Sequence, residues 1–374
     1  MDKIQMVDLH RQYLRFQPEI DAAMHEVIDS CAFINGPQVQ QFASALSAYL
    51  DVPYVIPCGN GTDALMIALM ALDLRPGDEV IVPAFSYVAA AEVVAHLGLI
   101  PVWVDVDENT FNINPWTIES AISPKTRAII VVHLFGQCCD MEKICQLAEV
   151  NHLYVVEDNA QSLGSENITK KGRRKSGTIA HIGTTSFFPS KPLACYGDGG
   201  AVMTSDGYLA ERIKMIASHG QQKKYHHKII GCNSRLDTIQ AAVLNVKLPH
   251  LDEFAKARQE VAQRYDEALG NDSRWKIPQQ TSYSTHVYHQ YTLQVADGKR
   301  DDLQNYLREK GIPSMVYYPL PLHKQTAFYG FSRRGSILNV SENLANSVLS
   351  LPIHTEMREE ELNYIIETIC NYDR

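Results

Sequence analysis

The sequence predicts an α/β fold, in which a large domain built on a mostly parallel sheet precedes a smaller C-terminal α+β domain. The chain has 374 residues, enough for two domains, and its 45% hydrophobic and 21% charged residues make an ordinary globular composition. Up to about residue 250, short β-branched runs alternate with helical patterns, which indicates a parallel sheet covered on both faces. This alternation of strand and helix patterns stops after Pro249. We therefore expect a large domain over residues 1–250 and a small domain over residues 251–374.

Each element is predicted from a local pattern. In the large domain, short β-branched or apolar runs predict strands at 54–56, 80–82, 101–104, 128–132 and 154–156. Helical patterns predict helices at 62–72, 87–97 and 141–150. In the small domain the sequence predicts a long charged helix at 252–269, a strand at 290–296, a helix at 301–310 and a helical C-terminus from residue 358.

Charge and composition exclude several classes of function. The 34 basic and 43 acidic residues give a formal charge of -9, so we expect no general attraction to nucleic acid or to an anionic membrane. The most apolar stretch, 88–104, is interrupted by polar residues and Pro101, so no membrane insertion is expected. The basic run 170–175 is typical of a solvated hairpin tip, although a nucleotide or nucleic-acid contact is an alternative.

The eight cysteines and the paired histidines predict no metal site. No cysteines form a C-x-x-C pair, and the first residues lack the apolar core of a signal peptide. We therefore expect free thiols in a reducing cytoplasm. His286 and His289 are three residues apart, but they have no acidic or thiol companion that would complete a metal site.

A glycine motif at 58–64 indicates a phosphate site. An expected strand leads into two glycines and a helix start, where Asn60 or Thr62 can act as the cap. Backbone N–H groups at such a helix start suit a phosphate. The pattern G-x-G-x-x-A also resembles a dinucleotide fingerprint, which needs an acidic residue at the far end of the next strand. Asp78 and Glu79 precede that strand instead, so the dinucleotide alternative is disfavoured; a plain helix cap is the other alternative.

Two further residues give the phosphate site a chemical context. Asp158 follows an expected strand, at the carboxyl edge where ligands of α/β proteins bind, and its carboxylate can pair with a protonated ring nitrogen. Lys191 lies between Pro189 and Pro192 in an apolar loop, where desolvation would lower its pKa and free its amine as a nucleophile. Alone, each could be a turn residue or a solvated charge. Together with the phosphate site they match the needs of pyridoxal phosphate.

Six stretches in chain order carry a resemblance to a known family. They are residues 60–65, 83–87, 157–162, 186–191, 219–220 and 233–237. Through them the sequence resembles the DegT/StrS family of nucleotide-sugar aminotransferases, a branch of the fold type I pyridoxal phosphate enzymes. The resemblance covers nearly the whole chain. It implies a fold type I aminotransferase with a sheet of the seven-stranded type, working as a homodimer with shared active sites.

The resemblance also implies roles for individual residues. Lys191 looks like the lysine that binds the cofactor covalently and moves a proton, and Asp158 resembles the carboxylate that keeps the pyridine nitrogen protonated. Other cofactor contacts are implied for Gln161 at the phenolic oxygen, Tyr87 against the ring, Gly61, Thr62 and Ser186 at the phosphate, and Asn233 at the phosphate of the neighbouring subunit's cofactor.

The implied substrates are glutamate, as amino donor, and a nucleotide-linked keto sugar. Stretches 220–227 and 318–325 resemble the subgroup that acts on 3-keto sugars, above all UDP-linked 2-acetamido-2-deoxy-3-keto-glucose or its glucuronic acid, used in surface polysaccharide. The candidate substrate-binding residues are Arg235, Tyr317, Tyr318 and His323. Tyr317 stands where this subgroup has a histidine, which leaves Arg235 as the candidate partner for an anion. A structural ion pair is the alternative for Arg235.

Three alternatives to this function stay open. The chain could aminate a dTDP-linked or other nucleotide-linked 3- or 4-keto deoxysugar. It could be a sugar dehydratase of the same fold, although those relatives have histidine in place of Lys191. It could also be a non-catalytic regulator that kept the fold.

Overall fold

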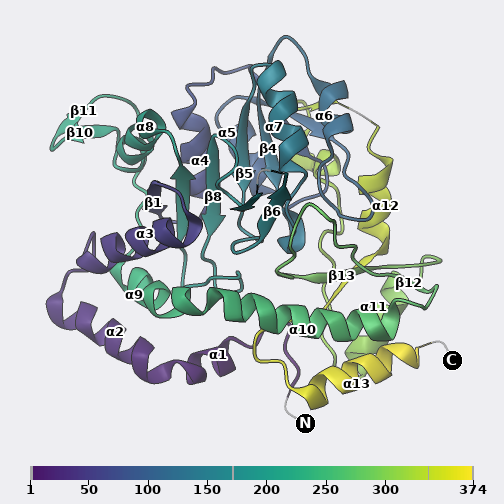
Figure 1. The fold of residues 1–374 in the computed structure, drawn as a ribbon. Coiled ribbons are helices and arrows are strands. Elements are labelled where there is room, and N and C mark those ends of the chain that lie inside the picture. Colours follow the sequence, from purple (N-terminus) through teal and green to yellow (C-terminus); the bar gives the residue numbers. More distant parts are fainter. Residues whose placement is uncertain (1–2, 171, 336, 373–374) are drawn as a thin grey trace.

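A computed structural model describes residues 3–170, 172–335 and 337–372, and a mixed sheet lies at its centre (Figure 1). In this described part the sheet has eight strands in the order β1-β9-β8-β5-β4-β2-β3-β14. Their bounds are Tyr54–Cys58 (β1), Glu79–Pro83 (β2), Ile100–Val104 (β3), Thr126–Val132 (β4), Tyr154–Asp158 (β5), Ile182–Ser186 (β8), Gly200–Thr204 (β9) and Arg333–Arg334 (β14). Among these eight strands, β9 alone runs in the opposite direction to the others. The predicted mostly parallel sheet is confirmed, with a two-residue eighth strand at one edge.

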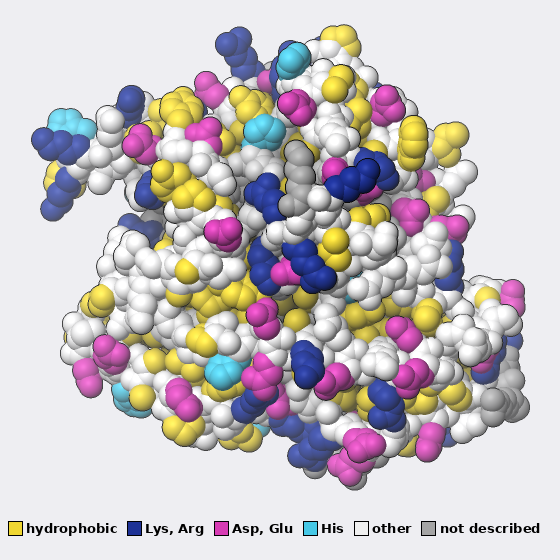
Figure 2. Space-filling view, in the orientation of Figure 1, with side chains coloured by type: hydrophobic (Ala, Val, Ile, Leu, Met, Phe, Trp, Pro, Cys, Tyr) yellow, Lys and Arg dark blue, Asp and Glu magenta, His cyan; other side chains and the backbone are white. Residues whose placement is uncertain are grey.

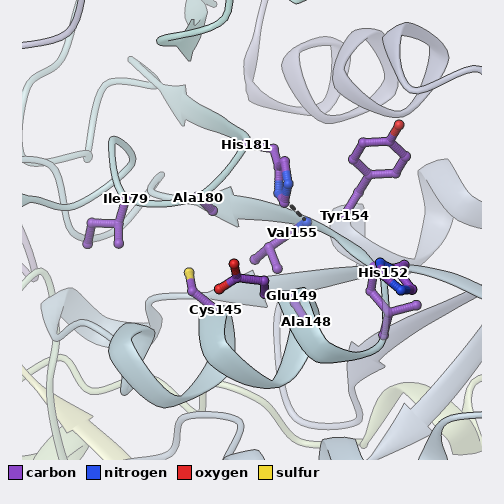
Figure 3. A pocket seen from close by; sticks show the side chains of 10 residues that line it. Cys145, Ala148, Glu149, His152, Tyr154, Val155, Ile179, Ala180 and His181 are labelled. Atoms are coloured by element: carbon purple, nitrogen blue, oxygen red, sulfur yellow. Dashed lines mark hydrogen bonds between the residues drawn. The ribbon is translucent and has the colours of Figure 1, made fainter.

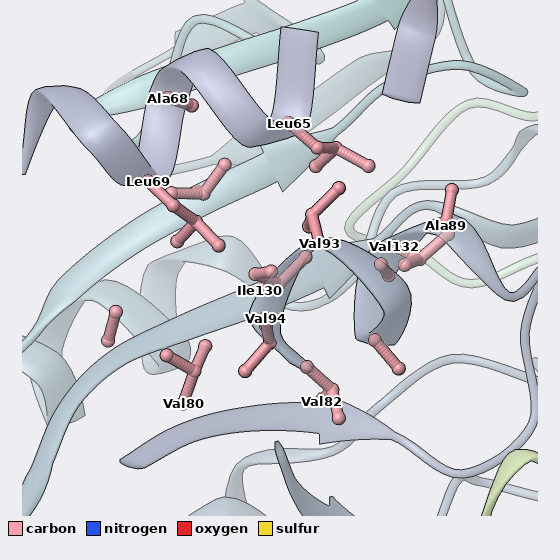
Figure 4. Close-up of a cluster of buried hydrophobic side chains, with 14 of the residues drawn as sticks. Leu65, Ala68, Leu69, Val80, Val82, Ala89, Val93, Val94, Ile130 and Val132 are labelled. Atoms are coloured by element: carbon pink, nitrogen blue, oxygen red, sulfur yellow. The ribbon is translucent and has the colours of Figure 1, made fainter. Parts of the chain in front are cut away.

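The sheet is buried on both faces, as the continuous apolar runs indicate. On one face, alternate residues of β2 and β4 pack under α4 (Gly61–Ala71) and α5 (Ala89–His96), as Figure 4 shows for Val80, Val82, Ile130 and Val132. The residues between them pack on the other face against α6 (Pro115–Ala121) and α7 (Met141–Val150). Because side chains alternate across a strand, apolar residues at every position are needed to bury both faces.

The remaining helices of the large domain complete these layers. They are α2 (Gln17–Ser30), α3 (Pro37–Leu50), α8 (Gly207–Ala217) and α9 (Thr238–Lys247). The predicted helix at 141–150 is confirmed, whereas the predicted helix at 87–97 begins two residues later. This shift leaves Tyr87 in the loop after β2, where its side chain is 56% exposed. No helix in the described ranges combines the length and the apolar character that crossing a membrane requires.

A smaller α+β unit with its own core follows the large sheet. The long helix α10 (Leu251–Leu269) runs beneath both units in Figure 1. Three antiparallel strands, β12 (Trp275–Lys276), β13 (Tyr291–Val295) and β15 (Val348–Leu351), pack with α10, α11 (Arg300–Glu309) and α13 (Glu359–Cys370). The second core includes Ile4 of the N-terminus, and α1 (Leu9–Arg15) joins it through Arg11 Nη2 and Glu361 Oε1, 2.7 Å apart. The smaller unit is confirmed, and its boundary at residue 250 stays a prediction.

Two hairpins carry the basic stretches of the sequence. The run 170–175 belongs to the hairpin of β6 (Glu166–Thr169) and β7 (Gly172–Lys175), where Glu166 pairs with Arg173 and Lys175 at 3.2 Å each; Lys171 lies outside the described residues. The hairpin of β10 (Gln221–Lys223) and β11 (His226–His227) projects from the body (Figure 1), and Lys and His side chains gather on it (Figure 2).

The position of Glu79 in the sheet excludes the dinucleotide alternative. It is the first residue of β2, at the amino edge of the sheet, and accepts a hydrogen bond from Arg333 Nη2 at 2.8 Å. Gly61 follows the carboxyl end of β1, at the opposite edge. The acidic residue that a dinucleotide site requires is therefore at the wrong edge.

Candidate active site

One cavity, of about 600 Å³, lies at the amino ends of β5 and β8 (Figure 3). Cys145, Glu149, Tyr154 and His181 are among its lining residues. The Nδ1 of His181 accepts a hydrogen bond from the backbone N–H of Val155 at 3.1 Å. None of the predicted site residues lines this cavity. It is therefore not the candidate site, despite its size.

A second cavity, of about 480 Å³, lies at the carboxyl ends of β5 and β8, the edge where parallel sheets bind ligands. It brings together seven of the eight predicted cofactor residues, which are Gly61, Thr62, Tyr87, Asp158, Gln161, Ser186 and Lys191. Two of the predicted substrate residues, Tyr317 and Tyr318, also line it. This cavity is the candidate active site.

Asp158 and Lys191 are opposite charges that share the cavity without a direct contact. Asp158 Oδ1 accepts a hydrogen bond from the Ala160 N–H at 3.0 Å, and the other carboxylate oxygen has no partner within the described chain. Burial raises the pKa of Asp158, against the lowering by the Ala160 N–H and Lys191. Burial lowers the pKa of Lys191, against the raising by Asp158, and the amine has no partner among the described residues. A carboxylate oxygen and an amine are both available to a ligand.

The start of α4 forms an anion cradle with the end of β8. Asn60 is the cap, because its Oδ1 accepts a hydrogen bond from the Asp63 N–H at 2.8 Å. The first N–H groups of a helix have no partner within it, so those of Gly61 and Thr62 are free to bind an anion. A Cβ on Gly61 would lie 2.7 Å from the Ser186 Cβ, so the two segments approach closely only because residue 61 is glycine.

Gln161 has a fixed amide orientation. Its Oε1 accepts a hydrogen bond from the Phe135 N–H at 2.7 Å, and its Nε2 lies 3.2 Å from the Tyr318 hydroxyl. Nε2 carries two hydrogens, so one remains for an oxygen acceptor on a ligand. The rings of Tyr318 and Tyr87 lie beside it, with centroids 6.4 Å apart.

Three predicted residues lie outside the cavity lining of their own chain. Asn233 is exposed and forms a β-bridge with Ser218. Arg235 is half-buried and makes no ion pair with a described residue, so the structural ion pair proposed as its alternative is not observed. His323 lies in the short helix η3 (Leu322–Lys324), and its Nε2 is 3.0 Å from Glu342 Oε1. Their roles toward cofactor and substrate stay predictions.

The cavity also includes residues to which the sequence assigned no role. Asp198 comes from the loop between β8 and β9, whereas His289 and Gln290 come from the segment before β13. In the sequence, the spacing of His286 and His289 raised only a metal site, and the lack of an acidic or thiol companion argued against that site. No local pattern could have indicated that His289 reaches this cavity, because it lies 98 positions after Lys191 in the chain.

The fold agrees with what comparison with known proteins finds. The profile of the DegT/DnrJ/EryC1/StrS aminotransferase family matches residues 15–370. The chain belongs to this family. The resemblance stated from the sequence motifs is thereby confirmed.

Relatives match along the whole chain. A pleiotropic regulatory protein of Geobacillus stearothermophilus is 43% identical over 375 residues, 99% of each chain. The UDP-2-acetamido-2-deoxy-3-oxo-D-glucuronate aminotransferase of Pseudomonas aeruginosa is 43% identical over 98% of this chain and 100% of that relative. The UDP-N-acetyl-3-dehydro-alpha-D-glucosamine 3-aminotransferase of Acidithiobacillus ferrooxidans is 40% identical over 98% and 97%.

Solved structures confirm the fold type. A DegT DnrJ EryC1 StrS aminotransferase from Brucella abortus superposes with a TM-score of 0.93 at 41% identity, covering 98% of both chains. A Bacillus subtilis protein solved with bound cofactor PMP superposes with a TM-score of 0.90 at 33% identity, covering 99% of this chain and 85% of that one.

Proposed function

We propose that this protein is a pyridoxal phosphate-dependent aminotransferase that moves an amino group from glutamate to a nucleotide-linked keto sugar. The observation that carries the proposal is the second cavity, where the Lys191 amine and one Asp158 oxygen are both without a partner in the described chain. Membership of an aminotransferase family and the relative solved with PMP support it.

The cavity residues fit the cofactor. When bound, pyridoxal phosphate supplies an electron-accepting ring that stabilises negative charge at the α-carbon of the amino donor. Lys191 would hold it covalently and, once released, carry a proton at Nζ. The free oxygen of Asp158 would accept a hydrogen bond from the ring nitrogen and keep it protonated. The cradle of Gly61, Thr62 and Ser186 would bind the phosphate.

Two more residues would orient the ring. The remaining Nε2 hydrogen of Gln161 would be donated to the phenolic oxygen, since Oε1 is already engaged by the Phe135 N–H. Tyr87, exposed at the cavity, would cover one face of the ring. These contacts would hold the reacting atoms in one geometry, which would reduce the entropic part of the barrier.

We propose UDP-linked 2-acetamido-2-deoxy-3-keto-glucose, or its glucuronic acid, as the acceptor, with the product used in surface polysaccharide. The names of the Pseudomonas and Acidithiobacillus relatives support this class of sugar. Arg235, Tyr317, Tyr318 and His323 remain the proposed substrate contacts. The relative named as a regulatory protein is equally similar, but the presence of both Lys191 and Asp158 favours catalysis here.

The active unit is proposed to be a homodimer with shared sites. Among the described residues that line the cavity, Lys191 is the single lysine or arginine, although a cofactor phosphate and a nucleotide diphosphate need several cations. The projecting hairpin β10–β11 carries exposed lysines and histidines, and Asn233 follows it. A second copy could deliver both to this cavity. All eight cysteines are free thiols, and we propose the cytoplasm as the location.

Trapping the cofactor tests this function. The purified protein should be yellow, its absorbance should change with glutamate, and borohydride reduction followed by peptide mapping should find the cofactor on Lys191. Lys191→Ala should fold without a covalent adduct, and Lys143→Ala, which changes an exposed lysine on α7, should label like the wild type. A label on another lysine would contradict the assignment. Product masses from a panel of UDP- and dTDP-linked 3- and 4-keto sugars would then identify the acceptor.

A further inference from the structure

The two buried histidines before β13 differ sharply in their surroundings. His286 and His289 are each 3% exposed. The Nδ1 of His286 accepts a hydrogen bond from the Tyr288 N–H at 2.9 Å, and its ring stacks on that of Tyr288 with centroids 3.9 Å apart. The Nδ1 of His289 is buried without a partner in the described chain, and His289 lines the cavity with Lys191. Leaving a buried polar group unpaired destabilises a protein, so such a group calls for an explanation.

The backbone around His289 is fixed to the edge of the large sheet. The Val287 N–H donates to the Gly136 carbonyl at 2.9 Å, in the short helix η1 (Leu134–Gly136) that follows β4. Gly136 has a φ of 113°, and a Cβ there would lie 3.0 Å from the backbone nitrogen of His289. The close approach of the two segments therefore depends on glycine. The adjacent Phe135 N–H orients Gln161. The imidazole is therefore placed by the same loop that places a proposed cofactor contact.

Burial and the neighbouring positive charges keep His289 neutral. Burial, together with the positive charges of Lys191 and Arg258, holds its pKa well below the usual range. Arg258, on α10, is buried and donates from Nη1 to the Ile353 carbonyl at 3.0 Å. Asp158 is the charged group that acts on Lys191 from β5. A neutral imidazole has one N–H and one lone pair, so it can accept from an ammonium or, in the other tautomer, donate to a free amine. The Asp158 carboxylate can only accept.

We propose that His289 is a positioning residue for Lys191, making a hydrogen bond to its amine in both protonation states while the lysine is free of the cofactor. This inference rests on the proposed function, in which Lys191 is released and carries a proton. A lysine has four rotatable side-chain bonds, and a fixed partner limits the positions that its amine can take. The unpaired nitrogen of His289 and the unpaired amine of Lys191 would each supply what the other lacks.

Labelling of the cofactor-free protein tests the contact directly. Trace acetylation by acetic anhydride at fixed pH, with peptide mass mapping, compares Lys191 with the other lysines of the same sample. His289→Leu removes both the acceptor and the donor, which leaves the amine lone pair more available. Lys191 should then label at least about threefold faster, the effect of losing one weak hydrogen bond. His289→Gln restores an acceptor and a donor at similar size, so its rate should lie within about twofold of the wild type.

His286→Leu is the matched control, because it removes a buried imidazole from the same segment but outside the cavity lining. It should lower stability and leave Lys191 labelling unchanged. In the loaded enzyme, His289→Leu should lower kcat by about 10- to 100-fold with a smaller change in KM for glutamate, and His289→Gln should recover most of it. If the Leu variant does not fold, His289→Phe replaces it.

Wild-type labelling of Lys191 in the Leu and Phe variants would overturn the proposal, as would an equal change in the His286 control. A wild-type protein that binds no pyridoxal phosphate would instead refute the proposed function. The labelling comparison does not depend on the cofactor, so the two failures are distinguishable.

Discussion

Replacing Glu157 by glutamine tests how β5, the strand that carries Asp158, is held in the core. Glu157 precedes Asp158 on β5 and is fully buried. Its carboxylate accepts four hydrogen bonds. Oε1 accepts from the N–H groups of Ile179 at 2.7 Å and Ala180 at 2.6 Å. Oε2 accepts from the Gly177 N–H at 2.8 Å and from His133 Nε2 at 2.9 Å. The Cys139 N–H donates to His133 Nδ1 at 3.1 Å, so the ring proton must be on Nε2.

The expected loss in the free energy of unfolding follows from counting the buried donors that lose their acceptor. An amide has one oxygen, so whichever way the Glu157→Gln side chain turned its NH2 group, two buried donors would face that group instead of an acceptor. A change of the His133 tautomer would not help, because the Cys139 N–H would then lose its acceptor. At about 1–3 kcal/mol for each unpaired group, the free energy of unfolding should fall by about 2–6 kcal/mol.

Urea unfolding, with Glu79→Gln as the control, measures this effect. Glu79 is also a buried carboxylate of the central sheet, but its partner Arg333 has a side chain that is 38% exposed, so water can replace the contact. The control should lose about 1 kcal/mol or less.

The pH dependence gives an independent check. Burial raises the pKa of Glu157, but the hydrogen bonds from His133 and the backbone outweigh it, and the net pKa is lowered. The stabilisation is therefore fully present above the ordinary glutamate pKa of about 4.3 and is lost as the pH falls through the folded-state pKa. The gap between wild type and variant should narrow in that acid range. A loss equal to the control's, or a gap that does not change with pH, would refute the reasoning.

Three further predictions concern the cavity itself. Asp158→Asn should lose several orders of magnitude in transamination rate with near wild-type stability, because an amide cannot keep the ring nitrogen protonated; near-normal turnover would contradict the role. Gly61→Ala should weaken pyridoxal phosphate binding by at least about tenfold in an absorbance titration, because its Cβ would meet Ser186 at 2.7 Å. Subunits lacking Lys191 and subunits lacking Asn233 should each be weak alone and recover part of their activity when mixed dimers form. Proven heterodimers that stay inactive would exclude the shared site.

Local patterns in the sequence predicted the main strands of the sheet and the polar residues at their carboxyl ends. The runs around Val80–Val82 and 128–132 predicted buried strands because both faces of a parallel sheet must be apolar, and β2 and β4 confirm it. Asp158 was placed at the carboxyl edge because it directly follows such a run. Asn60 was one of two possible caps, and only the structure chose between them.

Tertiary packing decided which distant segments share the cavity. His289 reaches the cavity of Lys191 because Gly136 lets its backbone approach closely. Gly61, which follows β1, lies against Ser186, the last residue of β8. Neither approach leaves a periodic signal in the chain, since each depends on where whole elements come to rest rather than on local propensity. The sequence by itself thus determined five strands of the central sheet, β1 to β5, together with the helix start and the reactive side chains, whereas β8, β9 and β14 were not predicted. Only the packing of the small domain onto the sheet edge decided that a neutral imidazole stands among them, because contacts between segments far apart in the chain are set by the shape of both cores.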